Sequence, residues 1–242
     1  MRSRFWYLVA AIGLVVPLSY PAAAADPLSF GVLPAPPYGL ERADKTVGGS
    51  NHDIAELIAA KVGLTFNYRL EPLARLIGDI KVSNLDLMIM IPGGQELNPF
   101  AVAEIMPSNT VVLTKAGGSI AQYADLKGKT IAVLRGAVYD QRFASDDDIK
   151  KYEVDSYAIG LRMTKGGRVD GMIGPELGLY YQMMIEGMKR DEFAAPLILN
   201  TRMLTLLGSK SITPELAAKL KAAVDELRSS GAIAAAVAKY ID

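Results

Sequence analysis

Residues 84–89 read NLDLMI, and residues 168–173 repeat this pattern as RVDGMI. In each copy an aspartate, Asp86 or Asp170, precedes small or apolar residues that are typical of the entry into a buried strand. The residues before each copy have the spacing of a helix followed by a turn. Two such repeats within a chain of 242 residues predict an α/β protein with two lobes, each with its own sheet.

The rest of the chain alternates between strand-like and helix-like segments. Strands are predicted at residues 28–33, 64–70, 85–91, 111–114, 130–134, 152–154, 169–173 and 203–207. Helices are predicted at residues 51–63, 73–80, 137–143, 156–163 and 177–188, with two more after Thr213 and Pro214. This alternation indicates mostly parallel sheets with helices on their faces.

Four loops follow predicted strands and carry the residues expected of a binding site. They are residues 34–38, 92–95, 135–139 and 174–176, which are rich in glycine, proline, aromatic or charged side chains. In open α/β sheets, ligands bind outside the carboxyl ends of the strands. We therefore expect these loops to surround a ligand.

Several motifs along the chain carry a family resemblance. The most specific is DLKGKTIAVLRG at residues 125–136. The others are FGV at 30–32, PPY at 36–38, the Gly49-x-x-x-Asp53 turn, Pro72-x-x-Arg75 and LRMTKGGRVD at 161–170. Together they resemble the bacterial extracellular solute-binding proteins of family 3, the periplasmic receptors of ABC importers. The resemblance implies a small-molecule ligand and an ABC transporter permease as partners.

The resemblance also implies a periplasmic binding protein fold of the Venus-flytrap type, whose two lobes close on a ligand by hinge motion. We expect residues 26–114 and 203–242 to form lobe 1 and residues 115–202 to form lobe 2. The two crossings between the lobes are expected near residues 113–117 and 196–203. Both chain ends then belong to lobe 1.

Three residues of lobe 1 are candidate ligand contacts. Tyr38 follows two prolines that stiffen its loop, so its ring is expected to form a stacking wall of the cleft rather than a surface aromatic. Asp53 begins a helix, where it either caps the helix or contacts the ligand. Arg75 lies beside an apolar helix stripe. It is either a surface residue with a buried stem or, as the resemblance implies, a ligand contact.

The candidates in lobe 2 lie at the ends of two predicted strands. Arg135, Gly136 and Ala137 join a strand to a predicted helix, where free backbone amides and the helix dipole favour an anion. The alternative there is an ordinary strand–helix turn. Arg135 and Tyr139 are expected to add charge-assisted and hydroxyl hydrogen bonds. Glu176 either accepts a hydrogen bond from the ligand or caps its own helix.

Two departures from the family pattern bear on the ligand. The loop PGGQELN at residues 92–98 has no arginine where amino-acid receptors of the family hold the α-carboxylate. Pro175 stands where those receptors hold the α-amino group with an aspartate. We therefore expect a small polar organic anion, held by the two candidate arginines, rather than an ordinary α-amino acid. Backbone amides at Gly93 and the neutral Gln95 side chain are expected to contact it.

The first 25 residues have the pattern of a secretory signal peptide rather than of an uncleaved anchor. A basic start with Arg2 and Arg4 precedes an apolar core and a run of small residues, after which cleavage is expected. The apolar core is shorter than the roughly 20 residues that span a bilayer. Cleavage removes two of 26 basic residues and leaves 24 against 26 acidic ones, a balance that disfavours nucleic-acid binding. We expect a monomeric periplasmic protein with no membrane span.

The residue types that common catalytic and metal sites need are scarce. The chain has one histidine and no cysteine, and it has no phosphate-binding or dinucleotide motif, so no metal or cofactor is expected. His52, Asp53 and Ser50 begin one helix and cannot form a catalytic relay. We expect a binding protein rather than an enzyme. Two alternatives stay open: a dehydratase with Glu176 as the acid, and an accessory or interaction protein of a periplasmic dehydrogenase or sensor.

Overall fold

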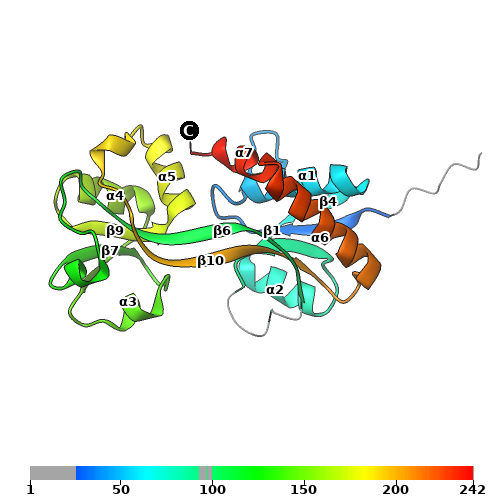
Figure 1. Ribbon diagram of the computed structural model, residues 1–242, viewed down its shortest axis with the longest axis horizontal. Helices are drawn as coiled ribbons and strands as arrows, with labels where there is room; N and C mark the ends of the chain where they lie inside the picture. The colour runs from blue at the N-terminus through cyan, green and yellow to red at the C-terminus, as the bar shows by residue number, and fades with distance from the viewer. Residues whose placement is uncertain (1–25, 93–96, 98–99, 242) are drawn as a thin grey trace, which may run out of the picture.

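One sheet of eight strands runs along the long axis of the computed structural model, which describes residues 26–92, 97 and 100–241 (Figure 1). The strand order is β4-β1-β5-β10-β6-β9-β7-β8. The strands are β1 (Leu28–Val32), β4 (Phe66–Leu70), β5 (Leu87–Met90), β6 (Ala101–Thr114), β7 (Thr130–Leu134), β8 (Lys150–Val154), β9 (Gly171–Pro175) and β10 (Leu197–Gly208). A separate hairpin consists of β2 (Leu40–Glu41) and β3 (Val47–Gly48). The strands at each end of the sheet pair in parallel, whereas β10 is antiparallel to β5 and β6.

Helices cover both faces of the sheet at each end (Figure 1). At the β4-β1-β5 end, called lobe 1 here, they are α1 (Ser50–Val62), α2 (Leu73–Lys81), α6 (Pro214–Ser229) and α7 (Ala232–Ala238). At the β9-β7-β8 end, called lobe 2, they are α3 (Gln141–Ser145), α4 (Tyr157–Lys165) and α5 (Glu176–Ile185). Two helix ends lie where the sequence predicts them. Gly63 ends α1 in the left-handed conformation, and the Thr213 hydroxyl accepts from the Leu216 amide at the start of α6.

Apolar side chains form separate cores in the two lobes. Phe30, Ile58 and Leu87 are fully buried in a cluster of lobe 1. Met172 and Leu179 are fully buried in a cluster of lobe 2. Each cluster packs a helix against its own parallel strands, as the internal repeat predicts. The predicted fold class, a two-lobed α/β protein with mostly parallel strands flanked by helices, is confirmed.

The two long strands β6 and β10 connect the lobes. In β6, Ala103 and Ile105 pack in the lobe 1 cluster, while Val111 and Leu113 pack in the lobe 2 cluster. The end of β6 thus packs in lobe 2, close to the first crossing predicted at residues 113–117. Because proline is rare inside strands, Pro107 prevented prediction of the first part of this strand from the sequence. Among the described residues it pairs on one side only, with β10, and proline is tolerated at such an edge.

The predicted second crossing, residues 196–203, overlaps the start of β10. This strand pairs with β6 along much of its length and reaches β5 of lobe 1 at Thr205. The exact division of the chain, with residues 26–114 and 203–242 in lobe 1 and 115–202 in lobe 2, stays a prediction.

The repeated aspartates make the same kind of hydrogen bond in both lobes. The Asp86 carboxylate accepts from the backbone amide of Ser29 at the start of β1, at 2.9 Å. The Asp170 carboxylate accepts from the backbone amide of Thr130 at the start of β7, at 2.8 Å. Each aspartate therefore fixes the beginning of a neighbouring parallel strand. The internal repeat reflects strand registration rather than ligand binding.

Replacing Asp86 with Asn is expected to destabilise the protein by about 1–3 kcal/mol, because the carboxylate also accepts from the Ser29 and Ser211 hydroxyls, both at 2.7 Å. Burial alone would raise the pKa of Asp86, but these hydrogen bonds outweigh it and hold the pKa below its usual 3.8. The lowered pKa means that the contribution is present above about pH 4 and is lost as the pH falls through the folded-state value. Urea unfolding at neutral and acidic pH measures this.

Asp170→Asn is the matched control for this prediction. Its carboxylate accepts one described hydrogen bond, from a backbone amide, so a smaller loss is expected. Equal losses in the two variants, or an Asp86→Asn deficit that persists in acid, would contradict the account.

Candidate functional site

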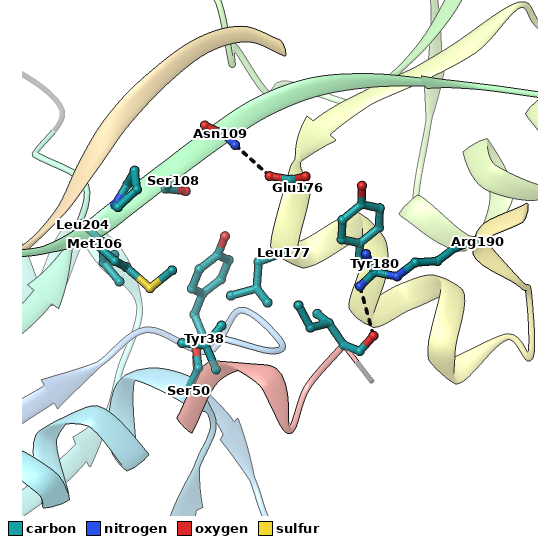
Figure 2. Close-up of a pocket in the computed structure, with 13 residues that line it drawn as sticks. Tyr38, Ser50, Met106, Ser108, Asn109, Glu176, Leu177, Tyr180, Arg190 and Leu204 are labelled. Carbon is teal, nitrogen blue, oxygen red and sulfur yellow. Dashed lines mark hydrogen bonds between the residues drawn. The ribbon is translucent and has the colours of Figure 1, made fainter. Parts of the chain in front are cut away.

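A pocket of about 270 Å³ lies between the two lobes (Figure 2). Its walls come from lobe 1, from lobe 2, from β6 and from the segment after α7. The lining residues are Tyr38, Ser50, Met106, Pro107, Ser108, Asn109, Glu176, Leu177, Tyr180, Arg190, Leu204, Val237 and Ile241. Since both lobes and a crossing strand contribute, any change in the angle between the lobes alters this pocket.

Tyr38 is held in the pocket wall by the first turn of α1. The amide of Ser50 donates to the Pro37 carbonyl at 2.8 Å, and the amide of Asn51 donates to the Tyr38 carbonyl at 3.0 Å. Gly49 joins the two segments with a φ of 107°, a conformation that favours glycine. The first amides of α1 thus position the loop after β1, and they are not available for a ligand.

Two hydroxyls in the pocket have no hydrogen-bond partner among the described residues, those of Tyr38 and Ser50. Burial raises the pKa of Tyr38 to about 12, with smaller contributions from nearby Tyr139 and Glu176 and an opposing one from Ser108. Ser108 does not meet the geometry of a hydrogen bond to Tyr38. Ser50 is 1% exposed. Buried hydroxyls are normally paired, so these two can receive polar groups of a ligand.

Glu176 is the acidic residue among the described side chains that line the pocket. It is the first residue of α5, and its carboxylate accepts from the Asn109 side-chain amide at 2.8 Å (Figure 2). The Asn109 side-chain oxygen accepts in turn from the Thr201 hydroxyl of β10, at 2.8 Å. Both crossing strands therefore orient this carboxylate.

A pair of partly buried tyrosines lies near Tyr38. The hydroxyls of Tyr139 and Tyr157 are 2.5 Å apart, and burial raises the pKa of both, that of Tyr157 strongly. The Tyr139 carbonyl and the Asp140 carboxylate both accept from the Asn200 side chain of β10. The loop that carries Tyr139 is therefore fixed to a crossing strand.

The predicted helix start at Arg135–Ala137 is wrong. Gly136 has a φ of 74°, and the Ala137 amide donates to the Leu134 carbonyl at 3.0 Å, so these residues form a tight turn. The helix α3 begins four residues after Ala137, at Gln141, because the Asp140 side chain accepts from the Phe143 amide and caps it there. The helix dipole expected to favour an anion at this turn is absent.

The two candidate arginines have carboxylate partners on their own lobes. Arg135 is 60% exposed and pairs with Glu153 at 2.5 Å and Asp155 at 2.9 Å. The hydrogen bond to Asp155, together with the charges of Asp155 and Glu153, raises the pKa of Arg135. Arg75 is 66% exposed and lies 3.4 Å from Glu71. Neither arginine lines the pocket between the lobes.

The other described residues predicted from the sequence as ligand contacts do not lie together in the structure. Ala137 and Tyr139 line a second cavity of about 280 Å³ beside α3, in lobe 2. Asp53 lies outside both cavities and contacts side chains from the segment after α7 and from the β2–β3 hairpin region. Gly93 and Gln95 lie outside the described residues. Of the ten candidates, the structure brings Tyr38 and Glu176 into the interlobe pocket.

Several polar pocket residues escape sequence-based prediction: Ser50, Ser108, Asn109 and Arg190. Ser50 stands next to a glycine at a helix start, which is a usable signal for a site. Ser108 and Asn109 belong to the part of β6 that was not predicted as a strand because it contains Pro107. Arg190 reaches the pocket from a short 3-10 helix, and no local pattern marks it.

Comparison with known proteins identifies the family. Residues 28–242 match the bacterial extracellular solute-binding proteins, family 3. The chain belongs to this family. A family 3 solute-binding protein has a small-molecule ligand and serves an ABC transporter, which agrees with a pocket between two lobes.

Among similar family 3 proteins, the L-arginine-binding protein of Pseudomonas aeruginosa is 26% identical over 238 residues, which cover 93% of this chain and 91% of the relative. The probable amino-acid-binding protein YxeM of Bacillus subtilis is 23% identical over 201 residues, covering 80% and 76%. The solved structure of an ancestral cationic amino acid solute-binding protein is 16% identical and has a TM-score of 0.73, covering 89% of this chain and 95% of that one. This last likeness concerns the fold.

Two properties of this solute-binding protein concern the described residues alone. No group of three or more His, Asp or Glu side chains there is placed to hold a metal ion. No helix in that part of the chain is long and apolar enough to cross a membrane.

Proposed function

We propose that this protein captures a small polar organic solute bearing a protonated amine and delivers it to an ABC importer from the periplasm. The observation that carries this proposal is the placement of Glu176. Its carboxylate lies in the interlobe pocket, oriented by Asn109 and across from Tyr38. A carboxylate that hydrogen-bonds a charged donor in a desolvated site binds it more strongly than a neutral acceptor does.

The rest of the pocket supports a ligand with both polar and apolar parts. The buried hydroxyls of Tyr38 and Ser50 can each bond a ligand group that takes the place of water. Met106, Leu177 and Leu204 provide apolar walls for its carbon skeleton. This combination suits a solute of amino-acid size with an amine at one end.

The expected anionic ligand has less support than an amine. It relied on Arg75 and Arg135, and both are exposed side chains paired with carboxylates outside the pocket. Similar proteins are named for arginine and for cationic amino acids, which agrees with a carboxylate in the pocket. The same names describe binding proteins, and this supports a role without catalysis, in which Glu176 holds the ligand rather than acting as a dehydratase acid.

Isothermal titration of the purified protein tests the proposal. The panel contains L-arginine, L-lysine, agmatine, L-glutamine, L-glutamate and succinate. We expect the amine-bearing cations to bind in preference to the two acids. Agmatine, which lacks a carboxylate, should bind within about tenfold of L-arginine, because the loop at residues 92–98 contains no arginine for the α-carboxylate. Preferential binding of succinate or L-glutamate would overturn the proposal in favour of an anion receptor.

A further inference from the structure

The segment after α7 runs from lobe 1 toward lobe 2 beside the pocket (Figure 1). On the lobe 1 side, the Asp53 carboxylate of α1 accepts from the Tyr240 hydroxyl at 3.2 Å and from the Lys239 ammonium at 3.3 Å. The Asp53 side chain is 17% exposed. A single carboxylate thus anchors two consecutive residues that lie 186 and 187 positions further along the chain.

Two further groups contact the Asp53 carboxylate. Arg42 lies 3.5 Å from the carboxylate and the His52 ring nitrogen lies 3.3 Å from it. Burial, followed by the charge of Asp53, raises the pKa of Tyr240 to about 12, so its phenol remains a donor at neutral pH. The structure therefore gives Asp53 a role in holding the segment after α7.

On the lobe 2 side, Arg190 holds the same segment. Its guanidinium donates to the Ile241 carbonyl at 3.1 Å and lies 3.9 Å from the centre of the Tyr180 ring (Figure 2). The rings of Tyr181 and Tyr240 have their centres 6.5 Å apart. Stacking on a tyrosine orients a guanidinium for directed hydrogen bonds. The contacts of Arg190 and Tyr181 join lobe 2 to a segment that Asp53 fixes to lobe 1.

We infer that residues 239–241 form an interlobe latch, with Asp53 and Arg190 as its positioning residues. The latch holds the lobes together without needing a ligand, and Ile241 places it in the pocket wall. Loss of either anchor lets the lobes separate and removes part of that wall. The effect of the latch on ligand affinity rests on the proposed function, whereas its effect on lobe separation does not.

Distances between spin labels test the latch in ligand-free protein. The chain has no cysteine, so Lys219→Cys in α6 and Asp147→Cys in lobe 2, both exposed, give two unique labelling positions. We expect Arg190→Ala and Asp53→Asn to shift the distance distribution toward longer values. Arg190→Lys should shift it partially, because lysine keeps the charge and loses the stacked planar group. Arg168→Ala, an exposed arginine of lobe 2 outside the latch, is the control.

Thermal unfolding distinguishes a role of Arg190 in the latch from a general role in stability. For Arg190→Ala we expect a melting temperature within about 3 °C of the parent, since the residue is exposed. With an amine-bearing solute such as L-arginine, the same variant should bind about fivefold to tenfold more weakly. Unchanged distances in Arg190→Ala and Asp53→Asn would overturn the latch, whatever the ligand titration gives. Absence of any ligand, with distances that shift as expected, would overturn the proposed function alone.

Discussion

Glu176→Gln is expected to weaken the binding of an amine-bearing cation by at least about 100-fold. The substitution keeps the size and shape of the side chain and removes its charge. The Asn109 amide can still donate to the new side-chain oxygen, so the local geometry is preserved. What is lost is the charge-assisted contact, which is worth more than a neutral hydrogen bond in a site closed between two lobes.

Isothermal titration with L-arginine measures this loss, and Glu186→Gln is the matched control. Glu186 follows the other end of α5, pairs with Arg162 and does not line the pocket, so its substitution should leave the affinity unchanged. A neutral solute that binds the parent should be affected much less by Glu176→Gln. If the two variants bind L-arginine equally, Glu176 does not recognise the amine.

Gly49→Ala is expected to cost about 2–4 kcal/mol of stability and to abolish ligand binding. A β-carbon at this position would lie 2.6 Å from the Tyr38 carbonyl oxygen and 2.8 Å from that of Pro37. Both atoms belong to backbone that α1 fixes by hydrogen bonds. The φ of 107° adds strain for any residue with a side chain. Relief of the contact must displace the loop that carries Tyr38.

Gly63→Ala is the control that distinguishes backbone strain at a positive φ from displacement of the loop that carries Tyr38. Gly63 has a φ of 68°, and a β-carbon there would meet no atom within 4 Å. We expect a loss of about 1 kcal/mol and unchanged binding. Chemical denaturation and titration of both variants make the comparison. Normal ligand affinity in Gly49→Ala would show that the loop at Tyr38 does not form the binding site.

Local sequence patterns determined the architecture of this protein and part of its site. The repeated Asp86 and Asp170 are followed by buried strands in both lobes, because the residues that favour a buried strand lie next to each other in the chain. Tyr38 and Glu176 were predictable for a related reason. Both follow strands of the sheet, and the carboxyl ends of such strands gather at one edge.

Only the tertiary structure decided which charged side chains face the ligand. The partners of Arg135 lie on and just after β8. Lys239 and Tyr240, which hold Asp53, follow α7 near the end of the chain, so the residues next to Asp53 in the sequence give no indication of them. A lone arginine in a sequence looks available, but its charge attracts whichever carboxylate the fold brings close. Asn109 and Arg190, which were not predicted, do line the pocket. Asn109 reaches it because β6 crosses between the lobes, and Arg190 reaches it beside the latch. These contacts join distant parts of the chain, and no local periodicity encodes them.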